Sequence, residues 1–211
     1  MIYDSSKRLV DILGASLGLL ITSPLLLIAC FAIKIDSKGP IMADTPMRVG
    51  SKGYLFKMYK FRSMVVGAYD LLQKNQDLLK KYKQNSYKLS IEDDPRITKV
   101  GRFIRKYSID ELPQLINILR GEMSLVGPRA YYPFELEEQQ KKYPNSREFV
   151  KIILSAKPGL TGVWQVSGRS DINFDKRVEM DALYVQRRSV LYDIFLIFKT
   201  FPAVLSGKGA I

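Results

Sequence analysis

The feature that most constrains this sequence is an uncharged apolar run near its N-terminus. From Ile12 to Ile33, in "ILGASLGLLITSPLLLIACFAI", no side chain carries a charge. As a straight helix this run would be about 33 Å long, enough to cross a bilayer core of about 30 Å. Lys34 and Asp36 follow it closely, without the small-residue cleavage site and polar continuation that end a signal peptide. The run therefore predicts a retained membrane segment.

A Ser-Pro pair at the middle of the run argues against a straight crossing. Pro24 removes one helical hydrogen bond and clashes with the carbonyl four residues back, while the hydroxyl of Ser23 can satisfy a freed backbone group. Basic residues flank the run on both sides, namely Lys7, Arg8, Lys34 and Lys38. Because positive residues mark the cytoplasmic side, neither end is favoured for export. We expect residues 1–38 to form a helix-break-helix hairpin that enters one leaflet and returns, with a kinked transmembrane helix as the alternative.

The remainder, residues 39–211, is long enough for one domain. Residues 39–64 have the alternation of a short strand or hairpin, and amphipathic or polar helices are predicted over 71–82, 111–120 and 179–188. The apolar C-terminal stretch is interrupted by Asp193 and Lys199, which favours an amphipathic helix on the membrane or in the core over a second span. The predicted fold is α+β and mainly helical, with a reentrant hairpin, a small cytosolic domain and amphipathic interfacial helices.

Charge and composition narrow the possible chemistry. A net charge of +12 implies an anionic partner, and nucleic acid, an anionic membrane surface or a phosphorylated substrate would each fit. The sequence has no histidine, which excludes Ser/His and Cys/His triads and His-ligated zinc. The one cysteine, Cys30, lies in the apolar run, where we expect an inert thiol. Catalysis would have to use carboxylates, lysine, tyrosine or a hard metal ion.

Two adjacent carboxylates, Asp110 and Glu111, stand out within "FIRKYSIDELPQL". Pro113 suits the first turn of a helix, so the helix should begin near Asp110, with Ser108 or Asp110 as N-cap. One interpretation is that these carboxylates only cap the helix, which would contribute about 1 kcal/mol. The other is that they are catalytic.

Basic residues in four separate motifs favour the catalytic interpretation. They are Lys60, Arg105, Arg129 and Arg169. If they converge, they would bind a diphosphate and keep Asp110 ionised, and that carboxylate could attack phosphorus to give an acyl phosphate. The charge would also require Mg²⁺, with Mn²⁺ as an alternative, held by Asp110 and Glu111 together with substrate phosphate. Neighbouring carboxylates cannot flank a sugar as glycosidase carboxylates do, so phosphoryl transfer fits better.

Several motifs together resemble the bacterial sugar transferase family, the monotopic polyprenyl-phosphate phosphoglycosyl transferases. They occur in family order across essentially the whole chain, as the apolar segment with Ser-Pro, "YKFRSM", "SIDELPQL", "MSLVGPR", "KPGLTGVWQVSGR" and "VEMDALYV". The sequence is similar to the minimal catalytic unit of that family. It departs from many relatives at Ala130, where they have proline, and we expect this to affect loop rigidity more than chemistry.

The resemblance implies a specific activity. Members transfer a sugar-1-phosphate from a UDP-sugar to undecaprenyl phosphate at the cytoplasmic face of the bacterial membrane and release UMP, as the first membrane step of exopolysaccharide, capsule, O-antigen or glycoprotein glycan assembly. Asp110 matches the nucleophile that forms a covalent phosphosugar intermediate, and Glu111 matches its partner in metal or acid/base work. Three basic positions and one acidic position of the substrate-phosphate site match Lys60, Arg105, Arg129 and Asp181. The motif that begins the reentrant hairpin matches Lys7, Arg8 and Asp11, and its break matches Ser23 and Pro24.

Two alternatives stay open at this point. The first is a non-catalytic, membrane-tethered basic adaptor or nucleic-acid-binding protein, for which charge and aromatic residues would suffice. The second is a conventional glycosyltransferase, which would release UDP instead of UMP. We favour a phosphoglycosyl transferase that does not bind nucleic acid and that contacts anionic lipid through its basic surplus. The sequence leaves open which sugar is moved and whether the protein forms a homo-oligomer.

Overall fold

The computed structural model describes residues 2–85, 89–168 and 172–206. Helices dominate these ranges, and the strands are short. In chain order the elements are α1 (Ile2–Asp36), β1 (Arg48–Val49), η1 (Ser51–Gly53), β2 (Leu55–Phe56), α2 (Ala68–Lys74), α3 (Gln76–Gln84), α4 (Lys99–Lys106), η2 (Ile109–Glu111), α5 (Gln114–Leu119), β3 (Ser124–Val126), α6 (Pro133–Lys142), η3 (Pro144–Ser146), α7 (Arg147–Ile153), β4 (Gly159–Thr161), α8 (Val163–Ser167), α9 (Phe174–Arg187) and α10 (Val190–Leu205). The predicted mainly helical α+β fold is confirmed.

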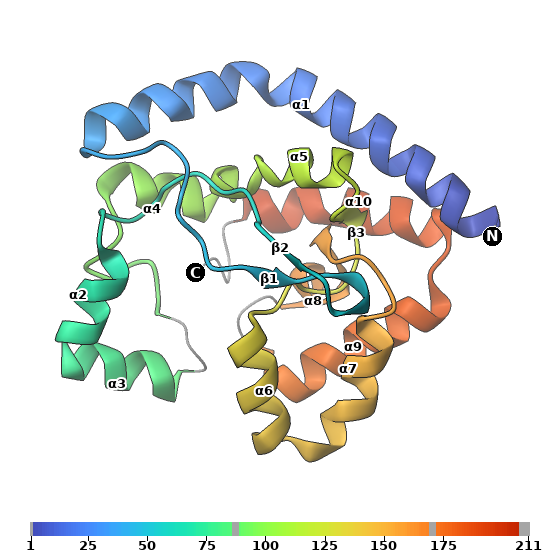
Figure 1. Cartoon of the computed structure of the whole chain (residues 1–211). Coiled ribbons are helices and arrows are strands. Elements are labelled where there is room, and N and C mark those ends of the chain that lie inside the picture. The colour runs from blue at the N-terminus through green and yellow to red at the C-terminus, as the bar shows by residue number, and fades with distance from the viewer. Residues whose placement is uncertain (1, 86–88, 169–171, 207–211) are drawn as a thin grey trace.

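Helix α1 is one continuous helix that contains Pro24. Its axis bends, so that the helix forms an arch over one side of the domain (Figure 1). The hydroxyl of Ser23 donates a hydrogen bond to the carbonyl of Leu20 over 2.8 Å, which is the carbonyl that Pro24 leaves without its helical partner. The role expected for Ser23 is therefore confirmed. The predicted break into two helices is wrong, because the residues on both sides of Pro24 stay helical.

Both halves of α1 pack along the same domain. The first half contacts α5, where buried Ala15 lies in a cluster with Leu115 and Ile118. The second half contacts α4, where Ala29 and Ile33 lie in a cluster with Ile104 and Ile109. Burial of each large aliphatic side chain contributes about 1.5–3 kcal/mol, so α1 is an integral part of the domain core.

The outward side of α1 is apolar and exposed. Its exposed large side chains are Leu9, Ile12, Leu13, Leu17, Leu20, Ile21, Leu25, Leu27, Ile28, Phe31 and Ile35. Helix α10 also exposes large apolar side chains, namely Leu191, Ile194, Phe195, Phe198, Phe201 and Leu205. Among the described residues, α1 is the one helix long and apolar enough to cross a membrane. Apolar patches of this size mark a membrane or protein contact, which fits membrane association.

Two small sheets lie beneath α1. The hairpin β1–β2 is antiparallel and pairs Arg48 with Phe56, which confirms the hairpin predicted within residues 39–64. Strands β3 and β4 are parallel and pair Ser124 with Gly159. Helices α6, α7 and α9 form the part of the domain farthest from α1 in Figure 1. The helix predicted over 71–82 is divided into α2 and α3 at Asn75, whose side chain caps α3 by accepting from the amide of Leu78.

Candidate active site

The two adjacent carboxylates lie together with a lysine from a distant segment. Lys60 Nζ is 2.6 Å from Glu111 Oε1 and 3.6 Å from Asp110 Oδ2. The backbone amide of Phe61 donates to the carbonyl of Asp110 over 2.9 Å, which holds the lysine segment against η2. The side chain of Asp110 is only 7% exposed, whereas that of Glu111 is 37% exposed. Asp110 therefore lies at the bottom of the site and Glu111 at its edge.

Helix capping does not explain these carboxylates. Ser108 has a left-handed backbone, with φ of 54°, and makes no side-chain hydrogen bond at the start of η2. Helix α5 begins only at Gln114, and Pro113 at its N-cap supplies no side-chain bond either. The predicted start near Asp110 is confirmed, because η2 begins at Ile109 with Ser108 at its N-cap position, but the predicted cap hydrogen bond is absent. The helix predicted over 111–120 is shorter, since α5 covers only Gln114–Leu119. The predicted stop at Gly121 is confirmed, because α5 ends at Leu119 and Gly121 has φ of +80°.

Burial and charge act differently on the two carboxylates. Burial raises the pKa of Asp110 above its ordinary value, and the charges of Lys60 and Arg105 only reduce this increase. Burial therefore opposes the ionised form of Asp110 that the basic residues were expected to maintain. Burial also acts to raise the pKa of Glu111, but the charge of Lys60 and its hydrogen bond outweigh burial, so this pKa lies below its ordinary value.

Arg105 reaches the site from α4. Its Nε donates to the hydroxyl of Ser63 over 2.8 Å. Helix α4 can lie this close because Gly101 has no side chain, and a Cβ there would overlap the backbone carbonyl of Ser63. Lys60 and Ser63 belong to one segment, so this segment joins α4 to the carboxylates.

Arg129 follows β3 and is held by α9. Its backbone amide donates to Oδ2 of Asp181 over 2.9 Å. Burial raises the pKa of Asp181 to about 7. The structure thus brings Arg129 and Asp181 together, but the carboxylate contacts the backbone of Arg129 and forms no ion pair with its guanidinium among the described contacts. Arg129 is close enough to Glu111 to lower its pKa. Arg169 falls outside the described residues.

Sequence reasoning missed two further arginines. Arg48 lies over the ring of Tyr132 at 3.3 Å and donates to the carbonyl of Ala130 over 3.0 Å. Arg177 on α9 lies over the ring of Trp164 at 4.9 Å. Both arginines are buried. Nothing in their local sequence distinguishes them from surface cations, and only the tertiary contacts identify them.

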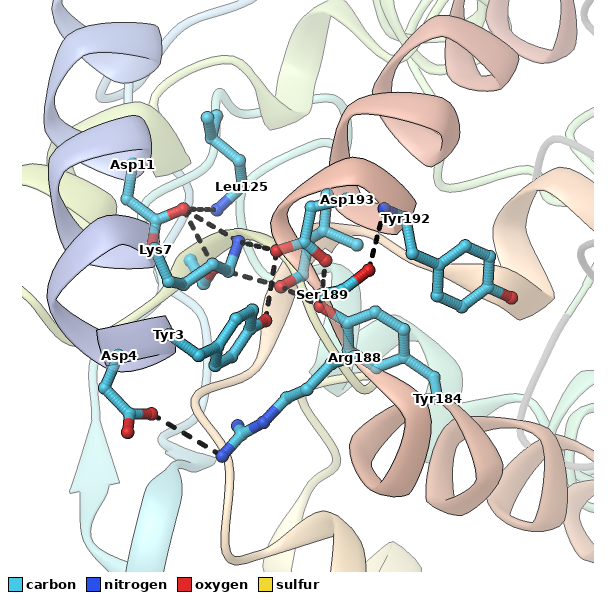
Figure 2. Close-up of polar contacts among 12 residues, drawn as sticks. Tyr3, Asp4, Lys7, Asp11, Leu125, Tyr184, Arg188, Ser189, Tyr192 and Asp193 are labelled. Atoms are coloured by element: carbon cyan, nitrogen blue, oxygen red, sulfur yellow. Dashed lines mark hydrogen bonds and ion pairs between the residues drawn. The ribbon is translucent and has the colours of Figure 1, made fainter. Parts of the chain in front are cut away.

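The motif at the start of α1 lies in a buried polar network with α10 and β3 (Figure 2). Lys7 Nζ is 3.0 Å from Asp11 Oδ1 and 3.2 Å from Asp193 Oδ2. Asp11 Oδ1 accepts hydrogen bonds from the hydroxyl of Ser124 and the amide of Leu125, each over 3.0 Å. This network fixes β3, which leads directly into Arg129. In the sequence, Asp193 could be noticed only as a charged residue that interrupts an apolar stretch.

Arg8 performs a separate task at the end of α5. Its two terminal nitrogens donate to the carbonyls of Ile118 and Leu119 over 2.6 and 2.8 Å. These carbonyls lie at the C-terminus of the helix, where a cation is favourable. Lys7, Arg8 and Asp11 thus do not join the carboxylates, but they hold the elements that carry the site.

The donor set around the carboxylates suits a hard metal only in part. Among the described residues, no group of three or more His, Cys, Asp or Glu side chains could hold an ion. Mg²⁺ commonly uses one or two carboxylates plus substrate phosphates, and the exposed edge of Glu111 could provide such a ligand. The residues therefore fit an ion that arrives with a phosphorylated substrate.

Together these features define a mainly helical α+β domain that fits membrane association and in which basic residues lie close to a pair of carboxylates. A profile of the family described as "Bacterial sugar transferase" matches residues 2–207. The chain is 44% identical over 207 residues to the undecaprenyl-phosphate galactose phosphotransferase of Salmonella typhimurium, covering 97% of this chain and 41% of that protein. It is 43% identical over 209 residues to the exopolysaccharide production protein ExoY of Sinorhizobium fredii, covering 97% and 88%. It is 42% identical over 207 residues to the UDP-galactose-lipid carrier transferase of Erwinia amylovora, covering 97% and 41%.

The chain belongs to the bacterial sugar transferase family. It spans about two fifths of the Salmonella and Erwinia relatives and most of the Sinorhizobium protein.

Proposed function

We propose that this protein is a phosphoglycosyl transferase that moves a sugar-1-phosphate from a UDP-sugar to undecaprenyl phosphate. Two relatives are named for an undecaprenyl-phosphate acceptor or a UDP-galactose donor, which supports this choice of substrates. A third is named for exopolysaccharide production, which supports a role in assembling an exported polysaccharide. The products would be undecaprenyl-diphosphate-sugar and UMP.

The reaction would occur in two displacements at one phosphorus. In the first, an oxygen of Asp110 bonds to the sugar-bearing phosphorus, and the bond to the bridging oxygen breaks, so that UMP leaves with the electron pair. In the second, an oxygen of the lipid phosphate bonds to the same phosphorus and the bond to Asp110 breaks. The carboxylate is regenerated, and no net proton is consumed.

The observation that carries this proposal is that Asp110 is buried and lies beside the ammonium group of Lys60. Lys60 lies 3.6 Å from one oxygen of Asp110 and 2.6 Å from Glu111, so one cation faces both carboxylates. Such a fixed charge can stabilise the negative charge that develops on phosphate oxygens during displacement. Arg105 adds positive charge near Asp110, and Arg129 adds positive charge near Glu111.

We further propose that Mg²⁺, or Mn²⁺, binds with the donor. When bound, such an ion would neutralise the diphosphate and favour departure of UMP. Glu111 is the better ligand, because its side chain is more exposed than that of Asp110 and its low pKa keeps it ionised. Asp110 would then stay free for bond formation.

A monotopic placement on the cytoplasmic face is also part of the proposal. Both ends of α1 bind the same domain: Arg8 bonds α5 at one end, and Asp36 accepts from the amide of Val100 in α4 at the other. A helix that crossed the bilayer would carry its two ends to opposite sides. The exposed apolar side of α1 would instead enter one leaflet, which sets Asp110 at the depth of the acceptor phosphate. The basic surplus of the protein would contact anionic lipid.

Intact-mass analysis tests the chemistry. The detergent-solubilised protein is mixed with candidate UDP-sugars and Mg²⁺ but no lipid acceptor. We expect a mass gain of one sugar phosphate, released UMP, and neither product with Asp110→Asn. Asp77→Asn, which removes an exposed carboxylate on α3, is the matched control and should behave as the wild type. Release of UDP would support a conventional glycosyltransferase, and full transferase activity of Asp110→Asn would overturn the proposal.

A further inference from the structure

Trp164 lies beside two guanidinium groups that come from different elements. Arg129 Cζ is 5.1 Å and Arg177 Cζ is 4.9 Å from the centre of its ring system. Trp164 is 8% exposed and Arg177 is 3% exposed. Arg129 follows β3, Trp164 is on α8 and Arg177 is on α9, so the fold brings three distant segments together here.

Each of these three side chains has a buried donor without a partner. Nε1 of Trp164, Nε of Arg129 and Nε of Arg177 make no hydrogen bond to any described residue. Leaving a buried donor unpaired is unfavourable, so isolated cases are uncommon in folded proteins. Nε1 of Trp164 and the Nε atoms of the two arginines beside its ring are thus free to donate to acceptor atoms of a ligand.

The charge balance indicates that this ligand is an anion. Arg129 and Arg177 form no ion pair with any carboxylate in the described ranges, and the same holds for nearby Arg48. The buried carboxylates whose negative charges act on these arginines are Glu135 and Asp181. Asp181 carries only part of a negative charge at neutral pH because burial raises its pKa to about 7. The guanidinium groups of Arg48 and Arg177, which are buried, and of Arg129, which is half-buried, thus face Glu135 and a partly protonated Asp181. A phosphate would balance the remaining positive charge.

We propose that Arg129, Trp164 and Arg177 form a subsite for the phosphate of the nucleotide that leaves during the reaction. This inference rests on the proposed function. The spatial arrangement of these side chains supports it. Arg129 is close enough to Glu111 to lower the pKa of that carboxyl, and Arg129 in turn lies beside Trp164, which also contacts Arg177. If the sugar-bearing phosphorus lies at Asp110, the next phosphate of the donor would lie toward Arg129 and Arg177.

The acceptor lipid also carries a phosphate, but the position of Arg177 in the domain favours the nucleotide as ligand. Helix α9 meets α1 at its C-terminal end, where Arg188 lies over the ring of Tyr3 at 5.2 Å. Arg177 is ten residues before Arg187, the last residue of α9, which corresponds to about 15 Å along the helix. Arg177 thus lies on the side of the domain away from the apolar helix α1.

The protein itself supplies the reporter for a test, because Trp164 is its one tryptophan. The full chain in detergent is excited near the red edge of tryptophan absorption and titrated separately with UMP, uridine and farnesyl phosphate. We expect UMP to change the emission in a saturable manner and uridine to leave it unchanged. An equal response to uridine would overturn a phosphate subsite, and a response to farnesyl phosphate but not UMP would assign the subsite to the lipid.

Variants of Arg177 separate binding from folding. We expect Arg177→Met to raise the KM for the UDP-sugar and the inhibition constant of UMP about 10- to 100-fold. Transfer of the sugar phosphate from the covalent intermediate to the lipid should keep its rate, since UMP has already left. Arg177→Lys, which keeps the charge but loses the planar fork, should be intermediate. Lys176→Met, which removes an exposed neighbouring charge, is the control.

The two proposals can fail separately. An Asp110→Asn protein that keeps its activity would remove the proposed chemistry, whatever UMP does to Trp164. Conversely, if Asp110→Asn is inactive and Arg177→Met binds UMP as tightly as the wild type, the subsite is wrong while the proposed function stands. If Arg177→Met does not fold, unchanged UMP inhibition of Arg177→Lys would equally overturn the subsite.

Discussion

The hydroxyl of Tyr184 on α9 donates a hydrogen bond to Oδ1 of Asp193 on α10 over 2.6 Å. The same hydroxyl lies 3.1 Å from the carbonyl of Val126 at the end of β3. Its single proton favours the short contact with the carboxylate, because a charged acceptor makes the stronger bond. One turn earlier on α9, Asp181 holds the backbone of Arg129. Helix α9 therefore holds Arg129 through Asp181 and binds α10 through Tyr184, and Asp193 links α10 to α1 through Lys7.

Removing the hydroxyl of Tyr184 should therefore destabilise the protein. Tyr184→Phe leaves the ring in place but takes a buried partner from Asp193, which should lower the free energy of unfolding by about 1–3 kcal/mol. For a chain of this length that corresponds to a fall in Tm of about 2 to 12 °C. Thermal unfolding in detergent measures it. Tyr54→Phe, at an exposed tyrosine, should leave Tm unchanged, and an equal Tm for both variants would contradict a structural role for this bond.

Lys60 offers a test of the charge that faces the two carboxylates. Lys60→Met removes the ammonium that bonds Glu111 and lies near Asp110, so negative charge in the displacement loses its nearest protein partner. We expect the rate of UMP release to fall about 30- to 1,000-fold, which corresponds to about 2–4 kcal/mol. A single-turnover assay with one UDP-sugar measures this rate.

The matched control for Lys60 is Lys57, three residues earlier in the same segment. Its side chain is exposed and, within the described part of the chain, its one ion pair is with the exposed Asp44 over 3.3 Å. Lys57→Met should keep the wild-type rate, because an exposed ion pair contributes little. Similar losses in the two variants would show that net charge, and not the position of Lys60, determines the rate.

The raised pKa of Asp181 predicts how stability depends on pH. In the unfolded chain an aspartate titrates near pH 3.9, whereas in the folded protein burial raises its pKa to about 7. Between these values the folded state binds more protons than the unfolded state, so stability falls as pH rises. This group alone would remove up to about 4 kcal/mol across that interval.

Asp181→Asn isolates this contribution, since asparagine can still accept from the amide of Arg129 but does not titrate. Unfolding of both proteins is measured at several pH values between about 5 and 8. We expect the variant to gain stability relative to the wild type as pH rises, because other groups titrate alike in both. Parallel curves would show that Asp181 has an ordinary pKa in the folded protein.

The sequence was sufficient where chemistry lies within a short motif. Local sequence was enough to single out the neighbouring carboxylates Asp110 and Glu111 as a candidate site. It was also enough to predict that the hydroxyl of Ser23 bonds a backbone group freed by Pro24. The convergence of Lys60 on the carboxylates agreed with a prediction from charge, although no local rule places a lysine 51 residues from Glu111.

What could not be predicted depends on tertiary contact. Arg48 and Arg177 are ordinary cations in sequence, and their burial follows from the packing of α6 to α9 around them. The continuity of α1 has the same origin. Proline favours a break, but α4 and α5 support the helix on both sides of Pro24, so packing outweighs local preference.

The membrane placement of α1 yields the last prediction. If both ends of the helix lie on the cytoplasmic face, cysteines placed near each end should react with a membrane-impermeant thiol reagent from the same side. Ser5 and Lys38 are exposed and suit this purpose, in a background where Cys30→Ala removes the native thiol. We expect Ser5→Cys and Lys38→Cys to be labelled in inverted membrane vesicles and protected in intact spheroplasts. Labelling of the two positions from opposite sides would establish a transmembrane helix, and the bonds of Arg8 and Asp36 to one domain could then not both exist in the membrane.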